Sequence, residues 1–192
     1  MVNKPYDMVS QFTSPHPVKL LGDLDFNFPP GTHAIGRLDK ESEGLLLLTT
    51  NKKVTRLLFQ GHALHKRDYL VQVKNMITSD GIHRLKTGVT LKGKGGEDYI
   101  SKPADVIIVE KPLNLVPLEH VLFEHPLHTW LRLSLTEGKF HQVRKMVAAV
   151  RHPCLRLIRL SIENIILGDL APGCVKEIPE NIFFQQLNIK FP

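Results

Sequence analysis

The densest group of reactive side chains in this 192-residue chain lies in residues 36–44, GRLDKESEG. The segment holds three acids and two bases between two glycines, and the apolar run 45–48 follows it directly. Glycine at both ends permits tight turns or the close approach of another backbone. Loops delivered by a rigid element commonly hold reactive groups. The loop is therefore a candidate position for a reactive group such as Asp39, although a surface loop in which Asp39 only caps a turn would have the same composition.

A second candidate is Tyr69, in the segment 68–73. Tyr69, Val71 and Val73 alternate with other residues, which predicts a strand with these three side chains on one side. A tyrosine packed into a core, or half-buried, would have the same pattern.

The third candidate segment is 137–146, EGKFHQVRKM. His141, Arg144 and Lys145 are three and four residues apart, so a helix would place them on one face, opposite Val143 and Val147. Basic side chains on such a face usually contact phosphate groups.

The formal charge of +6 is concentrated around this segment. The chain has 25 Lys and Arg residues against 19 Asp and Glu residues, and the window 139–159 accounts for the whole excess because it contains no acid. Its six bases are Lys139, Arg144, Lys145, Arg151, Arg156 and Arg159. A solvated helix face normally intersperses acids with its bases. The window therefore predicts a polyanionic partner, which could be RNA, DNA or an anionic membrane.

The elements that must position these residues are short strands and isolated helices. Strands are predicted over 45–49, 68–73, 104–109, 130–136, 155–161 and 164–167. Helices are predicted after Asn51, after Thr78 or Ser79, and after 138, the last with Phe140 and Val143 on its apolar face and an end at Pro153. Several steps between strands are too short for a helix. This predicts an α+β fold with a mostly antiparallel mixed sheet and flanking helices, as one domain or two intimately packed lobes.

Composition excludes several other classes of protein. Hydrophobic residues make up 42% of the chain, yet no apolar run approaches the roughly 20 residues that cross a bilayer. Residues 1–7 lack a signal-peptide core, and two distant cysteines make no disulfide framework, which predicts a soluble cytoplasmic protein that is not embedded in a membrane. The histidines have no helical metal motif around them, so no metal site is expected. These histidines are His62, His65, His120, His125 and His128.

Taken in order, these segments resemble the RsuA-type family of pseudouridine synthases. Residues 36–46 are similar to its active-site motif, and residues 3–12, NKPYDMVSQF, to its first motif. Tyr69 falls at the position of the family's active-site tyrosine, and 137–146 matches the motif with the active-site arginine. Residues 155–160 and 170–173 match its tail motifs, so the resemblance extends along nearly the whole chain.

The resemblance implies the pseudouridine synthase catalytic fold as a single catalytic domain over residues 1–192. The family isomerises a uridine within RNA: the base leaves C1′ through N1, turns and reattaches through C5. By position, Asp39 would be the nucleophile, Tyr69 would stack on the flipped base, and Arg144 would pair with the Asp39 carboxylate. The reaction needs no metal or organic cofactor. The residues expected to bind substrate are Arg37, Leu38, Lys139, His141, Gln142, Lys145, Arg151, Arg156, Leu157 and Arg159.

Two features indicate a branch of the family. No room for a small RNA-binding domain of the S4 type precedes the first motif, and the opening Asn3-Lys4-Pro5-Tyr6 is similar to the branch that modifies 23S ribosomal RNA. The expected partner is thus 23S ribosomal RNA or a ribosome assembly intermediate, bound by a monomer. Lys139, Phe140 and His141 depart from the Asn-Arg pair that this branch often has before Gln142, which affects the choice of target.

Two other classes of function are less consistent with the same residues. A catalytically silent module for RNA binding or ribosome assembly would not need Asp39, Tyr69 and Arg144, all of which are present. A basic DNA-binding regulator would need a recognition element, and nothing in the chain resembles a helix-turn-helix pair.

Overall fold

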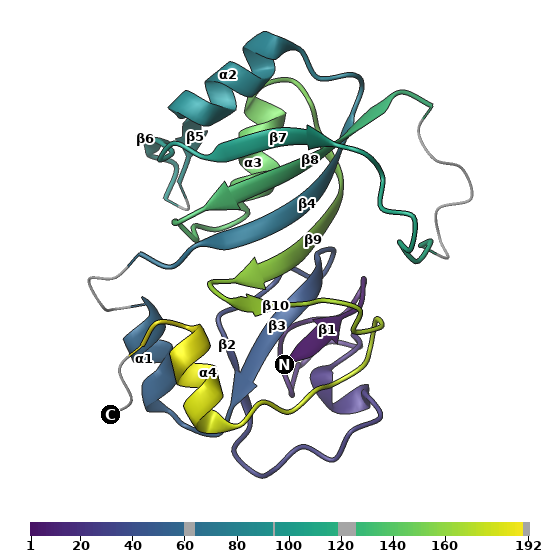
Figure 1. Ribbon diagram of the computed structural model, residues 1–192, viewed down its shortest axis with the longest axis vertical. Helices are drawn as coiled ribbons and strands as arrows, with labels where there is room; N and C mark the ends of the chain where they lie inside the picture. Colours follow the sequence, from purple (N-terminus) through teal and green to yellow (C-terminus); the bar gives the residue numbers. More distant parts are fainter. Residues whose placement is uncertain (60–63, 94, 119–125, 190–192) are drawn as a thin grey trace. The chain divides into compact units, whose positions relative to one another are not determined.

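The computed structural model describes residues 1–59, 64–93, 95–118 and 126–189, which divide into two compact units (Figure 1). Unit 1 comprises residues 1–65 and 158–192, and unit 2 comprises residues 66–157. Most described strand pairs are antiparallel and the β3–β9 pair is parallel. The predicted α+β class with a mostly antiparallel mixed sheet is confirmed.

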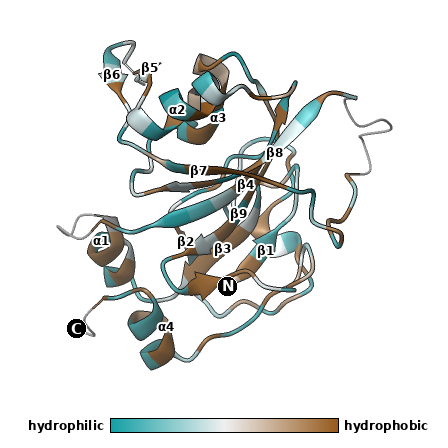
Figure 2. Ribbon diagram, turned by 45° about the horizontal axis from the view of Figure 1, so that its top comes forward, coloured by the Kyte–Doolittle hydropathy of each residue, from teal (hydrophilic) through white to brown (hydrophobic). Residues whose placement is uncertain are grey.

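Unit 1 is built around β3 (Glu43–Thr49), the strand that follows the Asp39 loop. It pairs antiparallel with β1 (Val2–Lys4) and β2 (His33–Ile35), and parallel with the second half of β9 (Cys154–Ile162). The continuous apolar run of β3 is explained by its central place, because Leu45, Leu46 and Leu47 are fully buried. Figure 2 shows the hydrophobic colour along this strand. The short β10 (Ile165–Ile166) pairs antiparallel with β9.

The helices of unit 1 are η1 (Leu21–Asp23), α1 (Lys53–Phe59) and α4 (Glu180–Gln186). Asn51 caps α1 as predicted, since its Oδ1 accepts a hydrogen bond from the Lys53 amide at 3.1 Å. The Nδ2 of the same residue donates to Glu180 at 3.2 Å and ties α1 to α4, which lie side by side (Figure 1).

Unit 2 contains the strand order β9-β4-β8-β7, in which β4 (Arg67–Lys74) pairs with the whole of β8 (His128–Leu135). The edge strand is β7 (Asp105–Val109), and β5 (Thr90–Lys92) and β6 (Asp98–Ile100) form a separate hairpin. The helices α2 (Ser79–Thr87) and α3 (Gln142–Ala149) pack on the sheet through one core. This core contains Val71, Leu85, Leu131, Leu133, Met146 and Val147.

The start of α3 differs from the sequence prediction. Phe140 was expected on the apolar face of the helix, but it is 58% exposed and stacks on the His141 ring at 3.9 Å between centroids. His141 has a left-handed backbone (φ 53°, ψ 27°), which is incompatible with a continuing α-helix, so α3 begins at Gln142. The apolar face is formed by Val143, Met146, Val147 and Val150.

Candidate functional site

The loop that presents Asp39 connects β2 to β3 in unit 1 and is fixed on both sides of that residue. Before it, the Ser10 hydroxyl donates to the Leu38 carbonyl at 2.8 Å and accepts from the Leu38 amide at 3.0 Å. After it, the Ser42 amide donates to the Asp39 carbonyl at 3.0 Å. Asp39 itself is half-buried. The backbone around the candidate nucleophile is therefore held by the first motif and by the loop itself.

Leu38 and Arg37, both expected to contact substrate, have different environments. Leu38 is 7% exposed and packs in a core cluster with Met8, Leu21 and Leu46. Arg37 is exposed. Burying Leu38 holds the loop against β3, whereas Arg37 is accessible to a ligand.

A buried lysine that was not among the predicted site residues contacts the same loop. The Lys4 side chain is fully buried, and its Nζ donates to the carbonyl oxygens of Met8 at 2.6 Å, Pro5 at 2.9 Å and Lys40 at 3.3 Å. Burial lowers the pKa of Lys4 to about 8, against the opposing influence of the Glu43 and Asp39 charges. The signal in the sequence was a lysine within the first motif, between Asn3 and Pro5.

Gly44 allows the end of the loop to approach β9 closely. Its φ is +96°, and an added Cβ would lie 2.7 Å from the Arg159 nitrogen and still closer to the Arg159 oxygen. Arg159, an expected substrate contact, is 4% exposed, and its Nε donates to the Leu45 carbonyl at 2.8 Å. Its described hydrogen bond therefore supports the strand that follows the loop.

In unit 2, Tyr69 lies in the hydrophobic core together with Leu157, another predicted site residue. Tyr69 on β4 is 8% exposed and shares one cluster with Val143 of α3 and with Leu157 of β9. Arg144, the residue after Val143, is half-buried in the first turn of α3. The structure thus brings Tyr69, Leu157 and the helix with Arg144 together.

The basic residues of unit 2 differ in exposure. Lys139 and Arg151 are exposed, and the Lys139 Nζ lies 3.5 Å from the centroid of the Tyr99 ring. Lys145 is half-buried and donates from Nζ to the Lys92 carbonyl at 2.7 Å. Arg156 is 8% exposed. Exposed bases are the natural phosphate contacts, whereas a buried arginine is constrained by its protein neighbours.

His141 and Gln142, also expected to bind substrate, lie at the start of α3. His141 is half-buried and stacks on Phe140. Gln142 is 4% exposed, and its amide is hydrogen-bonded within the protein: Oε1 accepts from the Lys139 amide at 2.9 Å, and Nε2 donates to Glu137 at 2.6 Å.

The whole net charge belongs to unit 2. Residues 66–157 hold 15 Lys and Arg against nine Asp and Glu, while unit 1 holds ten of each. A polyanion would therefore be attracted to unit 2, which agrees with the placement of the predicted basic window.

Neither a metal centre nor a membrane span is found among the described residues. No group of three side chains of the metal-binding types lies within reach of one ion in this part of the chain. His65 faces Glu163 at 3.4 Å and His128 stands edge-on to Trp130, while His62, His120 and His125 lie outside the described residues. No helix within the described ranges has the length and apolar composition needed to cross a bilayer.

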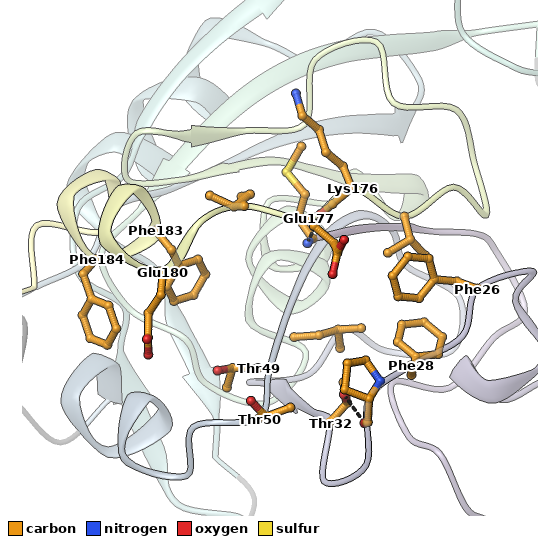
Figure 3. A pocket seen from close by; sticks show the side chains of 15 residues that line it. Phe26, Phe28, Thr32, Thr49, Thr50, Lys176, Glu177, Glu180, Phe183 and Phe184 are labelled. Carbon is orange, nitrogen blue, oxygen red and sulfur yellow. Dashed lines mark hydrogen bonds between the residues drawn. The ribbon is translucent and has the colours of Figure 1, made fainter.

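A cavity of about 300 Å³ in unit 1 is separate from the predicted site (Figure 3). Phe26 and Phe28 line one side and Phe183 of α4 lines another, with the Glu177 carboxylate directed into the space between them. None of the residues that line this cavity is a predicted site residue. The candidate chemistry is therefore not located here.

Comparison with known proteins adds a family match and close relatives. Residues 1–149 match the family model described as RNA pseudouridylate synthase. The chain is 38% identical over 178 residues to "Ribosomal large subunit pseudouridine synthase E" of Vibrio parahaemolyticus, covering 92% of this chain and 71% of the relative. It is 36% identical over 176 residues to the protein of the same name in Xanthomonas axonopodis pv. citri, covering 90% and 89%.

A solved structure has the same fold. The one described as "Crystal structure of pseudouridylate synthase" superposes with a TM-score of 0.76 at 24% sequence identity, covering 97% of this chain and 71% of the other. The structural likeness supports the fold that the sequence motifs predicted.

Proposed function

Because the chain belongs to the RNA pseudouridylate synthase family and is an isomerase acting on RNA, we propose a substrate for it. The proposed substrate is 23S ribosomal RNA, either free or within a ribosome assembly intermediate. The relatives that support this substrate are named large-subunit ribosomal enzymes and are similar over about nine-tenths of this chain. The charge of unit 2 supports a polyanionic partner independently. In this proposal residues 1–192 act as one catalytic domain.

Asp39 is the proposed nucleophile, and the observation that supports this most directly is its fixed loop. Ser10 holds the backbone at Leu38, and the Ser42 amide holds the Asp39 carbonyl. Such pre-organisation is what a nucleophile requires, because a carboxylate must be aimed at one atom of the sugar or base. The fully buried Lys4 also donates a hydrogen bond to the Lys40 carbonyl at 3.3 Å and so holds the backbone directly after Asp39.

Tyr69 and Arg144 complete the proposed site by resemblance. An arginine is always charged, so it keeps a neighbouring carboxylate ionised and oriented. A tyrosine ring packed among apolar side chains offers a fixed face for a base that has left its stack. In the overall reaction the N1–C1′ bond breaks and a C5–C1′ bond forms, while C5 loses a proton and N1 gains one. The reaction balances without an added reactant.

The test of the nucleophile compares two carboxylates of unit 1. Wild type, Asp39→Asn and Asp7→Asn are incubated with ribosomal RNA carrying tritium at C5 of uridine, and tritium release is measured. Asp7 is the matched control, since it forms a partly exposed ion pair with Lys40 at 2.9 Å. Asp39→Asn should release no tritium, while Asp7→Asn should release it as wild type does. Release at the wild-type rate by Asp39→Asn would overturn the assignment.

The test of the substrate is pseudouridine mapping of ribosomal RNA from cells with and without the gene. A uridine of 23S RNA should lose its modification when the gene is deleted and regain it when wild type, but not Asp39→Asn, is supplied. A change confined to 16S or transfer RNA would overturn the proposed substrate and leave the family assignment intact.

A further inference from the structure

The turn between β8 and α3 is closed by two side chains, Glu137 and Gln142. Gln142 Nε2 donates to Glu137 Oε2 at 2.6 Å, and the amide of Lys102 donates to the same carboxylate oxygen at 2.9 Å. At its other end, Gln142 Oε1 accepts from the Lys139 amide at 2.9 Å. The pair thus links residue 102, the turn and the first residue of α3.

Every contact of this pair joins a donor to an acceptor, and two are charge-assisted. Glu137 accepts two N–H groups with an ionised oxygen, which makes stronger hydrogen bonds than neutral partners do. Gln142 is 4% exposed, so water cannot easily replace either of its partners. Because its carbonyl faces an N–H and its NH2 faces a carboxylate, one orientation of the amide is selected.

The start of α3 lacks an ordinary side-chain cap. His141 occupies the N-cap position with a left-handed backbone and makes no side-chain cap hydrogen bond. The first turn of α3 contains Gln142 itself and Arg144 two residues later. The first residue of that turn, Gln142, is thus held by its side-chain hydrogen bonds to Glu137 and to the Lys139 amide, and Glu137 is held in turn by the Lys102 amide.

We propose that Glu137 and Gln142 form a clamp that positions Arg144 and that neither contacts RNA. This inference rests on the proposed role of Arg144 in the isomerase. It gives Gln142 a role other than the substrate contact that its place in the motif predicted. Misplacing a reacting or charge-stabilising group by about 1 Å can cost on the order of 10²-fold in rate. Loosening the clamp should therefore lower kcat and leave RNA binding unchanged.

Substitutions at both ends of the Gln142–Glu137 hydrogen bond test the clamp. In Gln142→Glu two carboxylates face each other, and in Glu137→Ala the oxygen that accepts from Gln142 and Lys102 is lost. Glu137→Gln is the conservative variant, because both donors meet one oxygen of Glu137 and the amide oxygen of glutamine can accept from both. Gln142→Glu and Glu137→Ala should each lose about tenfold or more in kcat, with KM changed less than about twofold, while Glu137→Gln should keep most of the wild-type kcat.

The matched control is Asn188→Asp in unit 1. Asn188 Nδ2 donates to Glu163 Oε2 at 3.0 Å, so this substitution also places a carboxylate beside a carboxylate. It should leave kcat unchanged. Circular dichroism melts of all variants, with kcat expressed per folded molecule, separate a positioning role from simple unfolding.

The outcomes distinguish this inference from the proposed function. An inactive wild type would overturn both. An active wild type together with a normal kcat per folded molecule for Gln142→Glu or Glu137→Ala would overturn the clamp alone. A loss confined to KM would show Gln142 to be an RNA contact and would also overturn the clamp.

Discussion

The Lys4 ammonium lies 3.3 Å from the Lys40 carbonyl oxygen and donates a hydrogen bond to it, so a fully buried charge holds the backbone directly after Asp39. Two more carbonyls, of Met8 and Pro5, share the same ammonium. The contacts join the first motif to the active-site motif within unit 1. Because Lys4 is ionisable and fully buried, its protonation also affects the free energy of unfolding.

The stability of the protein should depend on pH through Lys4. Burial lowers its pKa in the folded state to about 8, from 10.5 in the unfolded chain. Between these values the unfolded state binds more protons, so the free energy of unfolding should rise with pH by up to about 3 kcal/mol relative to a Lys4→Met variant. Urea unfolding of both proteins at pH 7, 9 and 10.5 measures the difference. The exposed-site variant Lys53→Met should show a constant difference from wild type, and a constant difference for Lys4→Met would contradict the prediction.

Gly44 should be far less replaceable than another glycine with a similar backbone. Gly31 has φ +83° and open space around the position of a Cβ, so Gly31→Ala should cost about 1 kcal/mol of backbone strain. In Gly44→Ala the added carbon would also collide with the backbone of Arg159, and the strand pair must separate. We expect a loss of at least about 3 kcal/mol in the free energy of unfolding. Equal losses for the two variants, measured by urea unfolding, would rule out the close approach of β3 and β9 as the cause.

The strand and helix pattern could be predicted from the sequence, but several contacts within the site could not. Alternation marked β4, and Thr78 marked the start of α2. The start of α3 was predicted wrongly, because hydrophobic spacing does not reveal the left-handed backbone conformation of His141. The Asp39 loop was identified from its charges, whereas the role of Lys4 depends on carbonyls that only the folded backbone brings together. Motif position likewise suggested RNA contact for Gln142 and Arg159, and could not reveal that their described hydrogen bonds are made within the protein.

Asp68 should stabilise the fold at neutral pH and cease to do so in acid. Burial would raise its pKa, but hydrogen bonds from Ser134 and Arg132, both at 2.6 Å, lower the pKa below its ordinary value of 3.8. A carboxyl with a lowered pKa contributes stability above its unfolded pKa, and this contribution is lost as pH falls through the folded pKa. Asp68→Asn should therefore be less stable than wild type by about 1–2 kcal/mol at pH 7, a figure kept small because Arg132 is half exposed. The deficit should shrink in urea unfolding as the pH falls below the ordinary pKa of 3.8, and a deficit that stays constant through this acid range would contradict the prediction.

Arg151 is the residue best suited to measuring the electrostatic contribution to RNA binding. It is exposed, it belongs to the unit that holds the whole net charge, and it lies outside the hydrophobic core of α3. Removing one phosphate contact should weaken RNA binding and lower the slope of log affinity against log salt by roughly one, because one fewer counterion is released. The slope is measured by filter binding of Arg151→Gln to ribosomal RNA between about 50 and 200 mM salt. Over this salt range phosphate contacts dominate the change in affinity. Lys53→Gln removes the same charge from the neutral unit 1 and should leave the slope unchanged. If both variants lower the slope equally, the attraction arises from the total charge of the chain and not from the basic window.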